Sequence, residues 1–244
     1  MMFLRNHEER SKKQVVLFLV EGPCDQTALE NGISSLYELA DKNILEVFFH
    51  VTKGDITSNN NITTRNIKSH IRDILTKTCI KNRLTPDDFF QIIQIVDLDG
   101  TYIPEENAKE DPSKENFYYE NNYIFNRDRD AIIRRNKDKK KKLDYLLSLD
   151  KIDNVKYRVL FFSSNLDHFL FNDANLSQKQ KEDEAIAFSF NELNTFVDVF
   201  LKDPDAANKK DYEKSWKYIK EGTNSLKRHT NVDLLIRELY SAYK

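Results

Sequence analysis

Residues 14–32 read QVVLFLVEGPCDQTALENG, and this stretch decides the fold. Six consecutive apolar residues, 15–20, are typical of a strand that is buried on both faces of a mainly parallel sheet. From Asp25 onward the apolar residues recur at steps of three and four, which predicts an amphipathic helix. A strand that leads directly into a helix indicates an α/β fold. Glu21 stands at the junction, immediately after the strand.

The same alternation of strand and helix continues along the chain. Each further predicted strand is short and apolar, and the helix between the second and third strands has one apolar face. The pattern predicts a mainly parallel sheet that is flanked by helices. The predicted segments are a strand at 47–51, a helix at 67–78, a strand at 90–96 and, much later, a strand at 157–162.

The chain divides into two parts by composition. Residues 1–176 form the predicted α/β domain, and residues 177–244 form a helical C-terminal extension that packs on it. Within the first part, residues 102–126 are polar and rich in Asn, Glu and Tyr, which predicts an insert with little regular structure. The whole inserted region, including a basic helix, spans about residues 102–151. Residues 203–207 contain a proline and predict a turn between helices of the extension.

Composition sets the broad class of protein. With 244 residues, 39% of them hydrophobic, the chain is long enough to bury a core, and its net charge of -2 gives no overall attraction to nucleic acid. The two cysteines have neither CxxC spacing nor a disulfide framework, which suits a reducing compartment and argues against structural zinc. The first apolar run is too short for a signal peptide or a membrane span. We therefore expect a cytoplasmic protein without a membrane segment.

Carboxylates follow two of the predicted strands. Glu21 comes directly after the first strand, and Asp97 and Asp99 follow the third. Because ligands of parallel α/β sheets bind outside the carboxyl ends of the strands, neighbouring strands would bring these acids together. Crowded carboxylates raise one another's pKa unless a cation neutralises them, and oxygen ligands without Cys or His suit magnesium or manganese. The alternative is that Glu21 and residues 97–100 form ordinary turns.

The segments VEGPCDQTAL at residues 20–29 and IVDLDG at residues 95–100 together resemble the Toprim domain of topoisomerases, primases and overcoming-lysogenization-type nucleases. The resemblance implies a Toprim-like sheet on which Glu21 is the first-strand acid. It implies that Asp97 and Asp99 are the Asp-x-Asp pair, and that the three acids hold one or two magnesium or manganese ions.

Two later segments narrow the resemblance. VLFFSSNLDHFLF at residues 159–171 and RHTNVDLLIREL at residues 228–239 are similar to blocks of RloB-like and AbiL-type Toprim proteins. Those proteins usually carry Ser-Asn-Pro and a Glu where this chain has Leu166 and Asp167. The shorter carboxylate reaches less far, so Asp167 is a catalytic candidate whose metal role the resemblance does not carry over.

Asp167, His168 and Asp25 each have both a functional and a structural interpretation. Asn165 is predicted to cap the next helix, which puts Asp167 in its first turn, where the helix dipole favours an acid in any case. His168 is a candidate general acid or phosphate contact, although a packed and hydrogen-bonded histidine explains it equally. Asp25 is either part of the site or the N-cap of the first helix.

The strongest local positive charge lies between Arg127 and Lys142, where nine of sixteen residues are Lys or Arg. Such a stretch attracts the phosphates of RNA or DNA without regard to sequence, and the nearby Tyr118, Tyr119 and Tyr123 offer stacking surfaces for unpaired bases. The alternative is a solvated helix face. The predicted nucleic-acid contacts are Arg134, Arg135, Lys137, Lys139, Lys140, Lys141 and Lys142.

The resemblance implies a metal-dependent endonuclease that acts in anti-phage defence or abortive infection, with an ATPase as its partner protein. RNA, including transfer RNA, is favoured over DNA because similar compact Toprim effectors include ribonucleases. One alternative is a ribosomal RNA maturation ribonuclease, although those enzymes are shorter and lack the two later segments. Another is a non-catalytic binding or regulatory module. No GxxxxGK[ST] loop is present, so ATP hydrolysis by this chain is not expected.

Overall fold

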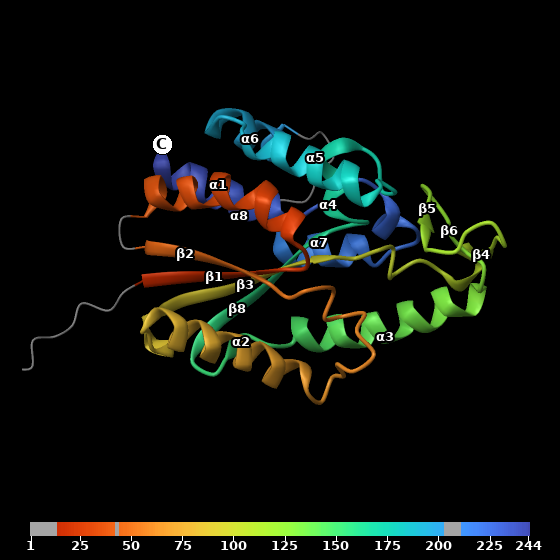
Figure 1. The fold of residues 1–244 in the computed structure, drawn as a ribbon, viewed down its shortest axis with the longest axis horizontal. Helices are drawn as coiled ribbons and strands as arrows, with labels where there is room; N and C mark the ends of the chain where they lie inside the picture. The colour runs from red at the N-terminus through yellow and green to blue at the C-terminus, as the bar shows by residue number, and fades with distance from the viewer. Residues whose placement is uncertain (1–13, 42–43, 203–210) are drawn as a thin grey trace, which may run out of the picture.

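The core of the computed structural model is a five-stranded sheet, and the structure describes residues 14–41, 44–202 and 211–244. The first four strands in the sheet order run parallel, and the last pairs with its neighbour as an antiparallel hairpin (Figure 1). The order is β2 (Ile44–Val51), β1 (Gln14–Val20), β3 (Phe89–Asp97), β8 (Val155–Phe162) and β7 (Lys151–Ile152).

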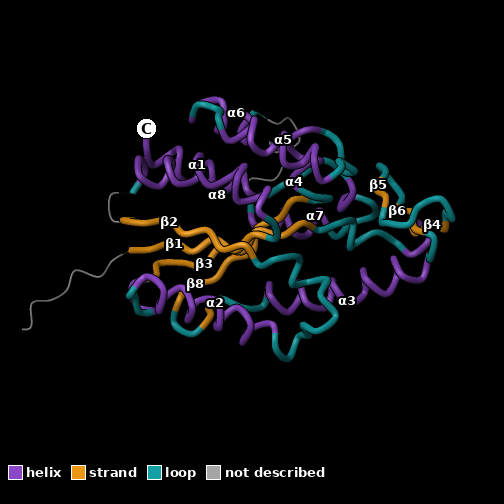
Figure 2. Tube along the Cα trace, viewed as in Figure 1, coloured by secondary structure: helices purple, strands orange, loops and turns teal. Residues whose placement is uncertain are grey.

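Helices cover both faces of the sheet, which gives three layers (Figures 1 and 2). One face packs against α1, α4, α5, α6 and α8, and the other against α2, α7 and the end of α3. The bounds are α1 (Pro23–Ala40), α2 (Ile67–Asn82), α3 (Arg129–Leu147), α4 (Leu166–Phe171), α5 (Gln178–Ser189), α6 (Leu193–Leu201), α7 (Tyr212–Ile219) and α8 (Val232–Tyr243).

The alternating side chains of β1 explain the two-sided burial that its sequence predicted. Val15, Leu17 and Leu19 enter the hydrophobic core on the α2 side of the sheet. The intervening residues, with Phe18 at the centre, enter the core on the α1 side. Since successive strand residues point to opposite faces, an unbroken apolar run is what a central parallel strand requires. The prediction of an α/β fold with a mainly parallel sheet is confirmed.

The C-terminal helices complete the α1 face of the sheet. α5, α6 and α8 pack against α1, and α8 also contacts β8. α1 and α6 approach closely at Gly32, where an added Cβ atom would lie 2.5 Å from the ring of Phe196. Gly32 is therefore required by packing and not by backbone conformation.

We predict that Gly32→Ala destabilises the protein, although alanine is the better helix former. The methyl group has no space beside the Phe196 ring, and overpacking of this kind costs about 1–3 kcal/mol. Urea unfolding of the variant would measure the change. Glu38→Ala, at an exposed position of the same helix, is the matched control and should change the unfolding free energy by less than about 0.5 kcal/mol.

The insert is more regular than its composition predicted. It contains a second sheet in the order β4 (Ala108–Glu110), β6 (Ile124–Asn126) and β5 (Tyr118–Tyr119). This sheet is stabilised by a small hydrophobic core, which consists of Ile103, Ala108, Ile124, Ile132 of α3 and Leu226 of the C-terminal part. The expectation of little regular structure was therefore wrong, because a few apolar residues among many polar ones are enough to anchor three short strands.

The other sequence-based predictions compare closely with the structure. The observed strands begin up to three residues earlier than predicted, and the basic helix lies where its pattern placed it. The pattern did not predict β7. The turn predicted at residues 203–207 lies outside the described residues. Across the described ranges, no helix combines the length and apolar character that a bilayer crossing needs.

Candidate active site at the carboxyl ends of the strands

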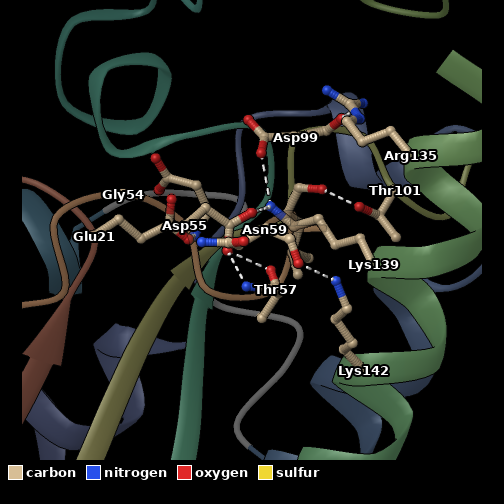
Figure 3. Close-up of polar contacts among 12 residues, drawn as sticks. Glu21, Gly54, Asp55, Thr57, Asn59, Asp99, Thr101, Arg135, Lys139 and Lys142 are labelled. Carbon is tan, nitrogen blue, oxygen red and sulfur yellow. Dashed lines mark hydrogen bonds and ion pairs between the residues drawn. The ribbon is translucent and has the colours of Figure 1, made fainter. Parts of the chain in front are cut away.

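Acidic residues gather where the parallel strands end. Glu21 follows β1, Asp97 is the last residue of β3, and Asp99 comes two residues later. β1 and β3 are adjacent in the sheet, so the first-strand acid and the Asp-x-Asp pair meet at one edge. Asp55, four residues after the end of β2, joins them (Figure 3). The sequence-based expectation that Glu21, Asp97 and Asp99 lie together is met by this arrangement.

Glu21 and Asp97 are held by backbone donors. The Asp97 amide donates to Oε1 of Glu21 at 3.0 Å, and the Leu166 amide at the start of α4 donates to Oδ1 of Asp97 at 3.1 Å. Burial, followed by the charge of Asp55, raises the pKa of Glu21 well above its usual range. Burial, followed by the charges of neighbouring aspartates, raises the pKa of Asp97 in the same way. Both acids thus lie where negative charge is unfavourable without added positive charge.

A buried lysine supplies part of that positive charge. The ammonium of Lys139 lies 2.7 Å from Oδ2 of Asp55 and 2.7 Å from Oδ2 of Asp99 (Figure 3). The Lys139 side chain is 0% exposed. Although burial opposes the charged form, the two carboxylates outweigh it and raise the pKa of Lys139 well above its usual range. Lys139 therefore remains charged and joins α3 to the ends of β2 and β3.

The other side of Asp99 is tied to the insert. The hydroxyl of Tyr119 donates to Oδ1 of Asp99 at 3.2 Å, and Arg135 donates to the Tyr119 hydroxyl at 2.9 Å. Arg135 also donates to the Asp99 carbonyl at 2.7 Å and lies 4.2 Å over the ring of Phe117. Asp99 has a φ of +51°, a left-handed conformation that Asp tolerates better than most residues. These contacts fix the orientation of its carboxylate.

Asp167 joins the cluster from α4. Asn165 caps this helix, as predicted, because its side chain accepts from the His168 amide at 2.8 Å. Asp167 is buried in the first turn, and its Oδ2 lies 2.7 Å from the ammonium of Lys181. Its charge is among those that raise the pKa of Asp97, so Asp167 lies near the strand-end acids. Its predicted membership of the site is consistent with this position.

Asp25 has a different role from the one predicted for a helix cap. Gly22 is the N-cap of α1, and Asp25 is the third helical residue, whose Oδ2 accepts from the Gly22 amide at 2.8 Å. The N-cap assignment for Asp25 was thus wrong by three positions. Burial raises the pKa of Asp25 to about 6. The residue lines a cavity of about 300 Å³ together with Glu21, Asp97 and Asp167.

A larger cavity opens beside the same acids. It has a volume of about 860 Å³, and Glu21, Asp97 and Asp99 are among the residues that line it. Residues 113–119 of the insert and residues 174–178 also line it, and so do Lys114 and Lys181. Three aromatic residues, Phe117, Tyr118 and Tyr119, also line it. The lining of the cavity therefore combines carboxylates, lysines and aromatic rings.

The donor chemistry of the cluster suits a hard divalent cation, since buried carboxylate oxygens are the ligands that magnesium and manganese prefer. As the side chains are arranged, no group of three or more His, Cys, Asp or Glu residues in the described ranges is placed to hold a metal ion. Lys139 between Asp55 and Asp99, and Lys181 at Asp167, provide the positive charge instead.

Part of the predicted nucleic-acid face on α3 is buried. The exposed fractions of Lys139 and Lys142 are 0% and 1%. Lys142 donates to the Asn59 carbonyl at 2.8 Å and pairs with Asp138. Neither lysine belongs to an exposed binding face, which corrects the prediction for these two. A run of four lysines covers more than half of a helix circumference, so some of them necessarily point toward the protein.

The remaining basic residues of α3 are distributed differently. Arg135 is half-buried against Asp99 and the insert, as described above. Four of them are exposed. Arg134 forms an ion pair with Asp128 at the start of α3, and Lys137 forms one with Glu105 of the insert. The other two exposed residues are Lys140 and Lys141. None of the seven residues lines the larger cavity within the part of the chain that the structure describes. Nucleic-acid contact by the four exposed residues stays a prediction.

His168 lies apart from the strand-end acids. It is half-buried, burial lowers the pKa of its imidazole, and it lines a third cavity between α4 and the insert. The structure therefore does not bring His168 into the same cavity as Glu21, Asp97 and Asp99. A role as general acid at those carboxylates has no geometric support.

Sequence reasoning missed Asp55, Lys181 and the carboxylate contacts of Lys139. Asp55 was detectable in principle, because it follows a predicted parallel strand by the same rule that selected Glu21. It was missed because it lies four residues after the end of β2 and not directly after the strand. Lys139 and Lys181 come from distant helices, and no local pattern in the sequence distinguishes them from other surface lysines.

Comparison with known proteins gives no family for this chain. The sequence matches no protein-family model and no curated protein, and the structure matches no solved structure.

Proposed function

We propose that this protein is a Toprim-type nuclease that uses magnesium or manganese to cleave phosphodiester bonds, with RNA as the preferred substrate. The observation that carries the proposal is the convergence of Glu21, Asp97 and Asp99 from two adjacent parallel strands, with the pKa values of the first two raised. Binding energy is available at such a site because a divalent cation relieves the unfavourable negative charge.

Glu21, Asp97 and Asp99 would hold the ion, with Asp167 as a further acid beside them. A bound divalent ion would supply an activated water and stabilise charge on the attacking and leaving oxygens. Lys139 already binds Asp99, so it competes with the ion for that carboxylate. Tyr119 and Arg135 keep Asp99 oriented toward the cavity from the insert side.

The larger cavity offers the contacts that a single-stranded nucleic acid needs. Lys114 and Lys181 line it and would neutralise phosphates. A base would stack on the ring of Tyr118 in place of the Lys114 ammonium, which lies 3.7 Å from the ring centroid. The volume of about 860 Å³ lies within the range of nucleotide-sized ligand sites. This placement puts the substrate against the insert and not along the exposed side of α3.

We predict that Lys114→Ala weakens RNA binding, because one phosphate contact is lost. The slope of the logarithm of the binding constant against the logarithm of the salt concentration should become less steep by about 1. The matched control is Lys141→Ala, which removes an exposed lysine of α3 that does not line the cavity. Filter binding at several salt concentrations would measure both. A larger effect of Lys141→Ala would place the nucleic acid along α3 instead.

The activity itself is tested by incubating the purified protein with transfer RNA, single-stranded RNA and plasmid DNA in magnesium, manganese or EDTA. The proposal predicts cleavage of RNA that needs the divalent ion. Cleavage that persists in EDTA would overturn the mechanism. A role in anti-phage defence with an ATPase partner remains part of the proposal, and it would be supported if the isolated chain gained activity on addition of such a partner.

One observation favours a second candidate, a non-catalytic binding or regulatory module of the same fold. Lys139 and Lys181 form ion pairs with three of the acids, Asp55, Asp99 and Asp167, and so already balance part of the negative charge of the cluster. A module of this kind would bind RNA equally well in EDTA and in magnesium, and would leave it uncleaved under every condition.

A further inference from the structure

The two edges of the five-stranded sheet differ in how they are protected. β7, at one edge, has only two residues, one of them a lysine, and it pairs with β8 as a hairpin. β2, at the other edge, has eight residues, ILEVFFHV, without a Lys or a Pro. Among the described residues, no strand pairs with its outer side (Figure 1). Edge strands of soluble proteins are usually short or carry Lys or Pro, because a long open edge pairs readily with another chain.

The backbone of β2 presents hydrogen-bonding groups on its open side. After one irregularity at the start of the strand, residues 46–51 pair with β1 without interruption. The amide of Thr52 donates to the Val20 carbonyl of β1 at 2.9 Å. Since alternate residues of a strand bond to the same side, the even-numbered residues of β2 bond toward β1. The amides and carbonyls of Val47 and Phe49 therefore point away from the sheet.

The apolar side chains of β2 are half-buried, in contrast to those of its neighbour β1. Phe48 packs partly against the core on the α2 side of the sheet, and Val47 and Phe49 pack partly against the core on the α1 side. Residues 15–20 of β1 are at most 1% exposed. The apolar layers on both faces of the sheet thus continue to the open edge, and one more strand there would cover them.

The face of β2 that carries Phe48 also carries two groups of complementary charge. Glu46 is exposed, and His50 lies four residues later on the same face. Burial, followed by the charge of Lys77 and of three other basic side chains, lowers the pKa of His50. The surroundings of His50 are therefore positive, and they would attract a carboxylate such as that of Glu46 from another copy of the chain.

Antiparallel pairing of β2 with the β2 of a second copy brings these groups together. With a two-fold axis at Phe48, Glu46 lies opposite His50 of the second copy. Val47 then lies opposite Phe49, which makes the outward-facing residues of the two strands exchange hydrogen bonds. An axis at Val47 or at Phe49 also permits the hydrogen bonds, but it leaves Glu46 opposite an uncharged residue. The axis at Phe48 is therefore the one that matches both backbone and charge.

We propose that two copies of this chain associate through their β2 strands, as an antiparallel pair with its two-fold axis at Phe48. One sheet then runs through both copies, and each contact occurs twice because of the symmetry. The Phe48 rings form a cross-strand aromatic pair, and Glu46 and His50 form two charged pairs, all of which stabilise the pairing. The candidate active sites lie at opposite ends of the combined sheet, and each is built from one chain. The inference does not depend on the proposed function.

Sedimentation equilibrium of the full chain tests the association. We expect a mass of twice 28.8 kDa at micromolar concentration. Val47→Pro removes an outward-facing amide but no hydrogen bond to β1, so the strand itself tolerates it. Because two intermolecular hydrogen bonds are lost, the dissociation constant of the dimer should rise by about tenfold. A wild type that keeps the mass of a single chain at every concentration would overturn the inference.

An exchange of charges tests the register. Glu46→Lys and His50→Glu each put like charges opposite one another, twice in each dimer, and each should weaken association by about tenfold. The double variant Glu46→Lys/His50→Glu restores opposite charges and should associate like the wild type. Glu110→Lys, which reverses an exposed charge on β4 of the insert, is the control and should leave the mass unchanged.

Circular dichroism of every variant checks that the chain is folded, so that a lower mass reports the interface alone. The inference is overturned if Val47→Pro and both single charge variants associate like the wild type. It is equally overturned if the single variants dissociate and the double variant does not recover, because the two strands would then pair in another register or not at all.

Discussion

Glu21→Gln is expected to lower metal-dependent cleavage by at least about 10²–10³-fold, the usual effect of removing a group that stabilises charge in the transition state. Glutamine keeps the shape and the oxygen that accepts from the Asp97 amide at 3.0 Å, so the local backbone stays in place. Single-turnover cleavage of the RNA substrate in magnesium measures the effect. Glu46→Gln, at an exposed position on β2, is the control and should cleave like the wild type.

The same substitution is expected to leave the fold as stable as the wild type or to stabilise it. The pKa of Glu21 is raised in the folded state, so the folded protein binds the proton more tightly than the unfolded chain does. The destabilisation by Glu21 is therefore complete above the raised pKa. It decreases as the pH falls below that pKa, and it vanishes only below the ordinary glutamate pKa, where the unfolded chain is protonated too. Thermal melts in EDTA near neutral pH should show an equal or higher midpoint for Glu21→Gln. A much lower midpoint would mean that Glu21 is structural.

Lys139→Met is expected to destabilise the protein by about 3 kcal/mol in EDTA, because it leaves Asp55 and Asp99, whose side chains are only 13% and 20% exposed, without their cation. If the carboxylates bind divalent ions, magnesium should then restore much of the lost stability. An ion at 100 times its dissociation constant stabilises by about 2.7 kcal/mol. For a chain of this size, each kcal/mol corresponds to about 2–4 °C in the melting temperature.

Lys142→Met is the matched control for this experiment. Lys142 is equally buried on the same helix, but it contacts the Asn59 carbonyl and Asp138 and not the strand-end acids. Its loss should destabilise the fold in a way that magnesium does not relieve. Equal rescue of both variants by magnesium would show a general effect of salt, and rescue of neither would contradict cation binding at Asp55 and Asp99.

The sequence predicted the sheet and its acids because both depend on local pattern. The apolar run of β1 is determined by burial on two faces, and Glu21, Asp97 and Asp99 follow strand ends that the same pattern locates. The neighbouring position of β1 and β3 then brings these three together. Asn165 was likewise predictable as a cap, because an N-cap needs only the residues of one turn.

What the sequence could not predict depends on contacts between distant segments. Lys139 belongs to a run of lysines, and only the packing of α3 against the ends of β2 and β3 decides which of them is buried. The small sheet of the insert likewise forms because Leu226, from the C-terminal part, completes its core. Gly100, with a φ of +66°, packs its Cα against Leu226 and Ile124, where an added Cβ would lie within 2.8 Å of each.

The central claim is that the acids at the ends of β1 and β3 bind a divalent cation. The most direct test is a titration with manganese in which electron paramagnetic resonance measures the concentration of the free ion. The account predicts saturable binding to the wild type that Glu21→Gln and Asp97→Asn each weaken strongly. Absence of binding to the wild type, or equal binding to all three proteins, would contradict it.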